Sequence, residues 1–408
     1  MKKIEVGFCG WGESWPLGTL ADIGQGPVFE YSAEAIRRGI QLSPLRVPLG
    51  AQSFGGFGAH QRGLPGFIDD ALPDGWGMLL MDRVFRKYGL APEALSPLDR
   101  LSFIGTRAMG ALSFEPAASL ELDDRDFTLL ELGRAAEALA DDGDLDTLKI
   151  LAIVGGSPHG ARPKALVQFE PRALRVSTHP EAVGEPWLVK FPARGEHKEV
   201  CGVEFAYAQV ARECGIDMPD AHLFDLGRDL AAFGVKRFDR EAGMRVPVHS
   251  AAGALHADFR LPSIDYQTLL RVTRFFTRDE QEVRKAFGRC VFNVVFHNRD
   301  DHAKNFAFRM DRRFEWKLSP AYDLSFSAGP AGRHQTSVMG EAQAPQRADL
   351  ERLAADSGLP KKFAVDCIGR TCEVARGLAP LLAQHGVRKA TRDAIASAVS
   401  QCVRRCVR

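Results

Sequence analysis

The first part of the chain alternates between apolar and polar positions. Ile4, Val6 and Phe8 are separated by single polar or small residues, and this period of two predicts a strand. Turn-rich stretches follow, and a helix is predicted to begin near Asp74. Because short strands and helices are mixed here, we expect a small α+β subdomain over residues 1–120, followed by an acidic linker.

The next part combines a sheet pattern with one amphipathic helix. Two strands are predicted after a glycine-rich turn, at 165–169 and 187–191, and two more near 221–225 and 231–238. Between the pairs, apolar residues at i, i+3, i+7, i+10 and i+14 predict a helix with one apolar stripe that ends at Gly215. The stripe consists of Val200, Val203, Tyr207, Val210 and Cys214. This pattern predicts a small sheet with one helix.

Beyond residue 239 the pattern becomes largely helical, with a long helix predicted over 279–298. We therefore expect an α+β fold. A strand-rich lobe at 121–240 is followed by a helical lobe at 241–408, and the subdomain at 1–120 precedes both.

Charge and composition exclude several classes of protein. Lys plus Arg (53) and Asp plus Glu (52) nearly cancel, so no net field would draw the chain onto nucleic acid or an acidic membrane. The chain begins directly with a predicted strand and contains no apolar run of about eighteen residues, so we expect a cytoplasmic protein without membrane association.

The eight cysteines are scattered and lack the paired C-x-x-C spacing of zinc and redox sites. Cys402 and Cys406 are one helical turn apart and could share a metal, but no histidine lies nearby in the sequence. We interpret all eight as small buried apolar residues.

One segment has the R-D-x-x-x-x-N spacing of a kinase catalytic loop, and it runs from Arg299 to Asn305. Phosphoryl transfer needs a carboxylate near the attacking hydroxyl and oxygen ligands for Mg²⁺. Asp300 is expected to accept the hydroxyl proton, and Asn305 to offer its carbonyl oxygen to the metal. Taken alone, the segment also fits a solvated helix C-terminus whose basic residues face the helix dipole.

Three further residues favour the kinase interpretation. Asp323 follows a predicted strand at 314–318, where a kinase has its second magnesium carboxylate. Lys190 ends a strand that resembles the V-A-I-K strand, whose lysine holds the α- and β-phosphates. Glu204 lies near the buried face of the next helix, where a charge needs a partner such as Lys190. Taken alone, Asp323 could simply be a residue that forms a turn, and Lys190 could simply be an exposed lysine at the end of a strand.

The glycine-rich turn is a candidate phosphate loop. Gly155, Gly156 and Gly160 allow backbone N–H groups to approach phosphate oxygens, and Arg162 and Lys164 add positive charge. The turn is not G-x-G-x-x-G, and a surface hairpin with basic flanks is the alternative.

The order of these parts decides between the interpretations. Glycine loop, strand lysine, helix glutamate, carboxylate loop and strand-end aspartate follow one another as in a protein kinase. The sequence therefore predicts a two-lobed, protein-kinase-like core with ATP and Mg²⁺ as cofactors.

Several motifs carry a resemblance to one family. They are N-x-D-x-H-x-K-N at 298–305, L-x-P-A-Y-D-L at 318–324, and the segments at 219–221, 237–240, 72–75 and 101–105. With them, the chain resembles the HipA family of serine/threonine kinase toxins over nearly its whole length.

The resemblance implies a role for each matching residue. Asp300 would be the catalytic base, Asn305 and Asp323 magnesium ligands, and Lys190 the lysine on the ATP phosphates. The remaining implied positions are the adenine hinge at Lys236, Arg237 and Phe238, with His302 and Lys304 supporting the loop or the phosphates.

Ser157 is a regulatory candidate by the same resemblance. Family members can autophosphorylate a serine in this loop, which ejects the loop and stops ATP binding. A simple turn serine is the alternative. This chain departs from the family pattern at Arg162, where glutamine is frequent, and Pro158 stiffens the loop.

The resemblance implies a toxin kinase that phosphorylates a serine or threonine of a protein, for example an aminoacyl-tRNA synthetase, and that can phosphorylate itself. It also implies a HipB-like helix-turn-helix antitoxin as partner, with DNA reached only through that partner. Two alternatives stay open. One is a small-molecule or lipid kinase, and the other is a binding or corepressor subunit of a toxin-antitoxin DNA complex.

Overall fold

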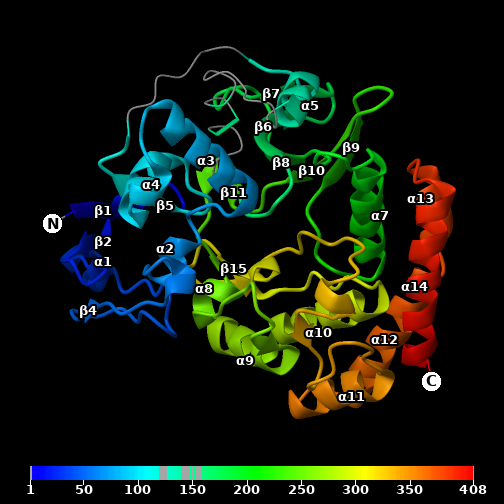
Figure 1. Ribbon diagram of the computed structural model, residues 1–408. Helices are drawn as coiled ribbons and strands as arrows, with labels where there is room; N and C mark the ends of the chain where they lie inside the picture. The colour runs from blue at the N-terminus through cyan, green and yellow to red at the C-terminus, as the bar shows by residue number, and fades with distance from the viewer. Residues whose placement is uncertain (1, 119–125, 139–147, 149–150, 153–157, 408) are drawn as a thin grey trace. The chain divides into compact units, whose positions relative to one another are not determined.

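The computed structural model of the protein describes residues 2–118, 126–138, 148, 151–152 and 158–407 (Figure 1). The chain forms two compact units. Unit 1 consists of Met1–Lys198 and His222–His249, and unit 2 of Glu199–Ala221 and Ser250–Arg408. The finer division predicted at residues 120 and 240 stays a prediction.

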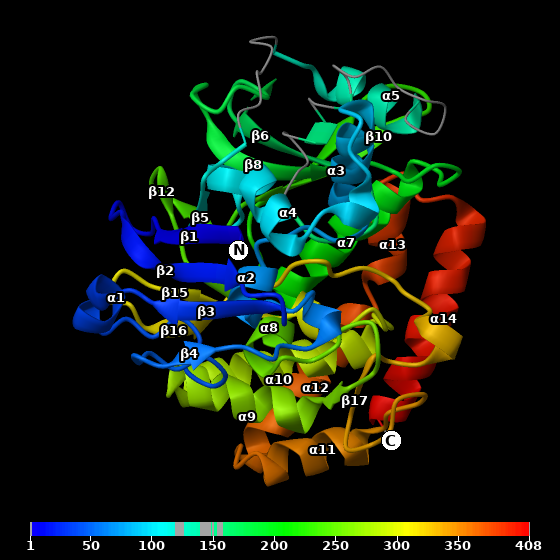
Figure 2. The same ribbon diagram turned by 60° about the vertical axis from the view of Figure 1, so that its left-hand side comes forward.

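Unit 1 begins with a five-stranded sheet in the order β4-β3-β2-β1-β5, in which all neighbours are antiparallel. Figure 2 shows β1, β2 and β3 side by side. Ile4, Val6 and Phe8 are buried and Glu5 is exposed, which confirms the strand predicted from the period of two. The strands are β1 (Lys2–Phe8), β2 (Trp15–Asp22), β3 (Pro27–Tyr31), β4 (Ser53–Phe54) and β5 (Leu112–Glu115).

Short helices connect and flank these strands. Helix α3 begins directly after Asp74, as predicted, and buries Trp76, Leu80 and Val84 on one face. Helix α4 starts with a capping box, in which Ser96 and Asp99 satisfy each other's backbone N–H groups. The helices are α1 (Ala33–Arg38), α2 (Gly66–Asp69), α3 (Gly75–Lys87), α4 (Pro97–Ile104) and α5 (Leu129–Ala138), with 3₁₀ turns at Ala59–Gln61, Pro92–Ala94 and Gly105–Arg107.

A second five-stranded sheet has the order β7-β6-β8-β10-β9. The four strands predicted between residues 165 and 238 all belong to it, which confirms the small sheet expected here. Its strands are β6 (Lys164–Glu170), β7 (Arg175–Ser177), β8 (Glu185–Lys190), β9 (Ala221–Asp225) and β10 (Ala231–Lys236). The hairpin β11 (Arg240–Glu241) and β12 (Met244–Arg245) follows, and β13 (Val248–Ser250) ends at the unit boundary.

Unit 2 is mainly helical, and its helices are α7 (Glu199–Glu213), α8 (Ala251–Leu255), α9 (Tyr266–Thr277), α10 (Glu280–Val295), α11 (Arg347–Asp356), α12 (Lys361–Ala375), α13 (Leu378–Gln384) and α14 (Lys389–Val407). Its short strands are β14 (Ile264–Asp265), β15 (Ala307–Met310), β16 (Trp316–Leu318) and β17 (Thr336–Ser337), with 3₁₀ turns at Ala303–Asn305 and Pro330–Gly332. The helix predicted over 279–298 is α10, capped by the side chain of Asp279. In the described part of the chain, no helix has the length and apolar character needed to cross a membrane.

Helix α7 confirms the predicted helix but is buried on more than one stripe. Besides Val203, Tyr207 and Val210, it buries alanines on other faces. Gly202 is in close contact with the chain after α13, because a Cβ there would lie 2.5 Å from the carbonyl oxygen of His385. The periodic pattern alone does not reveal such a neighbour, so the sequence predicted too narrow a buried face.

Glu199 joins the start of α7 to the start of α14, and this contact predicts a pH-dependent stability. Its carboxylate accepts hydrogen bonds from the backbone N (2.8 Å) and the guanidinium of Arg388 and from Thr391 Oγ1 (2.9 Å). Burial favours the neutral acid, but the Arg388 and Thr391 contacts outweigh it and lower the pKa of Glu199 from 4.5 to about 2. A depressed pKa stabilises the fold above pH 4.5, and this contribution is lost as the pH falls toward 2.

We therefore expect Glu199→Gln to lower the melting temperature at pH 7, and the difference from wild type to shrink between pH 4.5 and pH 2. Thermal unfolding by circular dichroism measures both. Glu373→Gln is the matched control, because Glu373 is exposed and pairs only at the surface with Arg376. An equal loss at every pH would contradict the assignment.

Candidate functional site

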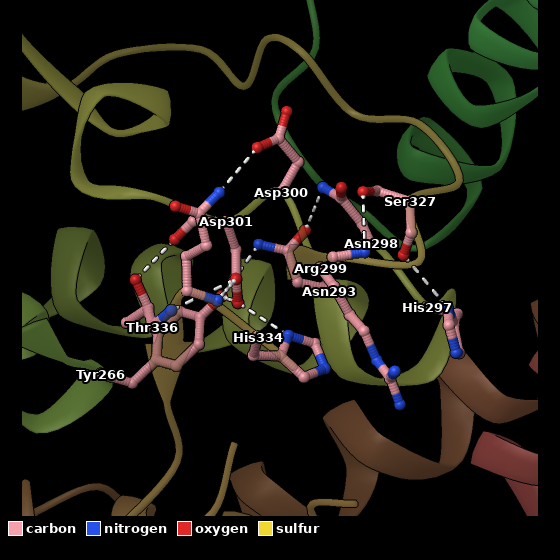
Figure 3. A network of polar contacts seen from close by, with 12 residues as sticks. Tyr266, Asn293, His297, Asn298, Arg299, Asp300, Asp301, Ser327, His334 and Thr336 are labelled. Atoms are coloured by element: carbon pink, nitrogen blue, oxygen red, sulfur yellow. Dashed lines mark hydrogen bonds and ion pairs between the residues drawn. The ribbon is translucent and has the colours of Figure 1, made fainter. Parts of the chain in front are cut away.

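The segment after α10 presents two adjacent carboxylates in opposite environments. The side chain of Asp300 is 55% exposed, whereas Asp301 is 0% exposed. Figure 3 shows Asp300 at the edge of the polar network, with its carboxylate pointing away from Asp301. Asp300 is therefore the more accessible of the two carboxylates, and its role as the catalytic base stays a prediction.

Asp301 holds the loop in place. Its Oδ2 accepts hydrogen bonds from Tyr266 Oη and His334 Nδ1, both at 2.8 Å. Its Oδ1 accepts from the backbone N of Gln335 at 2.8 Å and of Thr336 at 3.3 Å. Since an ionised carboxylate only accepts, His334 must carry its proton on Nδ1. Four donors satisfy this buried charge, which fixes the loop beside Asp300.

The rest of the loop is fixed by its amide and guanidinium groups. Asn298 Nδ2 donates to Asn293 Oδ1 at 2.9 Å, and Arg299 donates to the carbonyl oxygens of Gly332 (2.5 Å) and Gln343 (2.8 Å). The Arg299 contacts join the end of α10 to the segment that follows β16. Figure 3 shows Ser327 of that segment beside His297 and Asn298.

The two predicted magnesium ligands both lie in unit 2. Asn305 Nδ2 donates to the carbonyl oxygen of Asp300 at 2.6 Å, so the amide oxygen of Asn305 takes no part in this contact. Asp323 adopts a φ of +53°, a left-handed conformation that is uncommon for residues other than glycine. Such conformations gather at functional sites. Carboxylate and amide oxygens are ligands that suit Mg²⁺.

Lys304 and His302 surround one aromatic ring. Lys304 is 5% exposed, and its Nζ lies 4.5 Å from the ring centroid of Phe259, a cation–π contact. The His302 ring lies 5.4 Å from the same ring, and His302 Nε2 is 3.8 Å from Asp300 Oδ1. The Lys304 carbonyl oxygen accepts from Tyr322 Oη at 2.5 Å. Both residues thus pack against Phe259, and their support of the loop or of the phosphates stays a prediction.

In unit 1, Lys164 and Lys190 lie directly opposite each other on β6 and β8. Opposite residues of an antiparallel pair point to the same face, and these lysines are only 3% and 9% exposed. Lys190 Nζ is 5.8 Å from the ring centroid of Phe233 on β10. Two cations on one face suit the charged phosphates of a nucleotide.

The described end of the glycine-rich turn is held by the segment before α3 and by the first residues of α3. The backbone N of Gly160 donates to the Asp74 carboxylate, and the backbone N of Trp76 donates to the Gly160 carbonyl oxygen at 3.1 Å. His159 Nε2 contacts the Leu72 carbonyl oxygen at 2.9 Å. We call residues 72–76 the loop clasp. The clasp fixes one end of the candidate phosphate loop.

We expect Gly75→Ala to weaken ATP binding, because the clasp has no room for a side chain. A Cβ at Gly75 would lie 2.7 Å from the Gly160 carbonyl oxygen and 2.9 Å from the Ala161 Cα. The loop must move to accommodate it, so the KM for ATP should rise several-fold in steady-state kinetics.

Gly89→Ala is the matched control for this substitution. Gly89 follows α3 with a φ of +73°, and a Cβ there would meet nothing within 4 Å. Both variants strain a left-handed backbone, which costs about 1 kcal/mol. Equal KM values for ATP in the two variants would exclude a role of the clasp in nucleotide binding.

The predicted adenine hinge lies where β10 ends. Lys236 pairs with Glu185 at 2.5 Å, and the Arg237 guanidinium donates two hydrogen bonds to Asp239, at 2.9 and 2.8 Å. Burial would raise the pKa of Asp239, but Arg237 and Arg240 hold it well below its usual range. The side chain of Arg237 is thus engaged in an ion pair, and any adenine contact would fall to the backbone of 236–238 or to Phe238.

Some predicted residues are not brought together by these contacts. Glu204 is 4% exposed in α7 of unit 2, whereas Lys190 belongs to unit 1, so their ion pair stays a prediction. The candidate loop residues Gly155, Gly156 and Ser157 lie outside the described residues.

Two domains described for known protein families match this chain, one after the other. Residues 11–115 match the HipA N-terminal domain, and residues 156–378 match the HipA-like C-terminal domain. The second match alone covers more than half of the chain. The chain belongs to the HipA kinase family.

Curated relatives of this HipA-family chain are named putative kinases. Y4dM of Sinorhizobium fredii is 27% identical over 48% of this chain and 52% of the relative. A protein of Haemophilus influenzae is 24% identical over 33% of this chain and 43% of the relative. The chain thus spans about half the length of the curated relatives it matches.

A solved structure confirms the HipA fold. A chain from the complex of the Shewanella oneidensis MR-1 toxin-antitoxin system HipA, HipB and its operator DNA superimposes with a TM-score of 0.70 and 18% identity, covering 99% of this chain and 96% of that chain. The protein therefore has the predicted α+β, kinase-like fold with an N-terminal subdomain.

Sequence reasoning missed the residues that hold the predicted catalytic loop of this HipA-family chain in place. Tyr266, His334 and Thr336 contact Asp301 from positions about 35 residues away along the chain. Spacing rules for catalytic loops do not include such partners. The one local signal was the Asp300-Asp301 pair, because two neighbouring carboxylates of a tight loop rarely share one environment.

Proposed function

We propose that the chain is an ATP- and Mg²⁺-dependent serine/threonine protein kinase of the HipA toxin type. One observation carries the proposal: Asp300 is exposed while Asp301 beside it is buried and held by four donors. To take a proton from an attacking hydroxyl, a carboxylate must be accessible and held in a fixed position, and this loop provides both.

In this mechanism Asp300 orients the substrate hydroxyl and receives its proton. The oxygens of Asn305 and Asp323 would hold Mg²⁺, which when bound neutralises charge on the transferred phosphoryl group. Lys164 and Lys190, buried on one face of their sheet, would hold the phosphates of ATP. The clasp at 72–76 keeps one end of the phosphate loop in place.

The finer parts of the proposal come from the family. We infer a protein substrate, for which an aminoacyl-tRNA synthetase is the first candidate, and autophosphorylation at Ser157. A HipB-like antitoxin is the proposed partner, because the superimposed relative comes from a complex with HipB and operator DNA. Contact with DNA would be indirect, through that partner.

The test incubates the purified full chain and a cell lysate with Mg²⁺ and γ-labelled ATP. Label on the chain itself or on a lysate protein supports the proposal, provided that EDTA and Asp300→Asn abolish it. Label confined to a small metabolite or lipid favours a small-molecule kinase. No label, together with co-purification of a DNA-binding protein, favours a binding or corepressor subunit. Mass spectrometry of the labelled lysate identifies the target and reports on Ser157.

A further inference from the structure

Gln335 contacts both carboxylates of the catalytic loop. Its side-chain Nε2 donates to Asp300 Oδ1 at 2.9 Å, and its backbone N donates to Asp301 Oδ1 at 2.8 Å. The same residue therefore connects the exposed carboxylate to the buried one. No kinase spacing rule places a glutamine here.

The backbone of Gln335 is fixed on both sides. His334 before it and Thr336 after it both hydrogen-bond to Asp301, and Thr336 Oγ1 also donates to the Asp301 carbonyl oxygen at 2.5 Å. Thr336 also belongs to β17, which pairs in parallel with β14. Because the main chain is fixed on both sides, the side-chain amide of Gln335 is held next to the Asp300 carboxylate.

The amide suits a positioning role chemically. It is a neutral donor, so it fixes the plane of the Asp300 carboxylate through a hydrogen bond without adding charge. Two titratable neighbours among the described residues are His302, whose Nε2 lies 3.8 Å from Asp300 Oδ1, and the Asp301–His334 pair. Neither supplies the short, directed hydrogen bond that Gln335 makes.

We propose that Gln335 is a positioning residue for phosphoryl transfer, which orients the carboxylate of Asp300 toward the hydroxyl of the protein substrate. This inference rests on the proposed kinase function. If this hydrogen bond is used in the transition state, its loss should lower the rate roughly 10–100-fold.

The experiment compares Gln335→Leu, Gln335→Glu and Gln343→Leu with wild type in steady-state phosphorylation and in thermal unfolding. Gln335→Leu removes the donor at similar volume, so kcat should fall at least tenfold while the KM for ATP stays within twofold. Gln335→Glu replaces the amide donor by an acceptor, so kcat should fall at least as far as in Gln335→Leu, again with the KM for ATP within twofold. Gln343 is exposed on the same segment and contacts Arg299 only through its backbone carbonyl oxygen, so its side-chain variant should match wild type.

Each outcome decides the question. An active wild type with unchanged kcat in Gln335→Leu overturns the positioning role and leaves the kinase function standing. A raised KM for ATP at constant kcat would assign Gln335 to nucleotide binding instead. A fall in kcat accompanied by a lower melting temperature in Gln335→Leu would reduce the role to a structural one. An inactive wild type overturns the proposed function and this role together.

Discussion

Replacing Asp300 by Asn should lower the rate of phosphoryl transfer by about 10²–10⁴-fold, the usual contribution of a general base, with little effect on folding or ATP binding. Asn keeps the shape of the side chain and an oxygen that can accept from Gln335 Nε2, but it cannot take up a proton. Because the side chain is 55% exposed, no buried charge is lost.

Three measurements separate these effects. Initial rates with labelled ATP give kcat, titration calorimetry gives the ATP affinity, and thermal unfolding gives the melting temperature. Asp366→Asn serves as the control, since Asp366 is exposed on α12 and should behave as wild type in all three. If Asp300→Asn keeps more than a tenth of the rate, the base must be another group.

The regular elements were predictable because each leaves a periodic trace in the sequence. The strand at Ile4 to Phe8 alternates by two, and α10 repeats its apolar residues at helical spacing, so local pattern and final burial agree. The buried face of α7 was underestimated because its neighbours come from α13, which the local pattern does not contain.

The candidate site was predictable only where function requires fixed spacing along the chain. Asp300 and Asn305 are five residues apart in one loop, so a short motif captures both. The clasp is different: the segment 72–75 was noticed as a motif, but its contact with Gly160 joins residues 86 positions apart. Contacts over such distances depend on how the sheets and loops pack, and periodicity carries no information about that.

The second large effect is expected at the neighbouring carboxylate. Asp301→Asn should lower the free energy of unfolding of unit 2 by about 3–5 kcal/mol, the usual cost of removing one partner from a buried charged network. The carboxylate has two accepting oxygens for four donors, whereas Asn has one oxygen and a donating NH₂ group. In either orientation, the NH₂ group would face two other donors, either Tyr266 and His334 or the two backbone N–H groups. These donors would then lose their acceptor.

Differential scanning calorimetry at pH 7 measures this effect. For a unit of this size, a loss of that magnitude lowers the melting temperature by roughly 6–20 °C. Thr336→Val is a graded companion, because it removes only the hydrogen bond from Oγ1 to the Asp301 carbonyl oxygen, with an expected cost of about 1 kcal/mol. A melting temperature of Asp301→Asn within 2 °C of wild type would mean that water or a relaxed loop satisfies the four donors. Asp300→Asn should lower the rate of phosphoryl transfer but not the melting temperature, whereas Asp301→Asn should lower the melting temperature. This pair of results would assign the reaction to Asp300 and the support of the loop to Asp301.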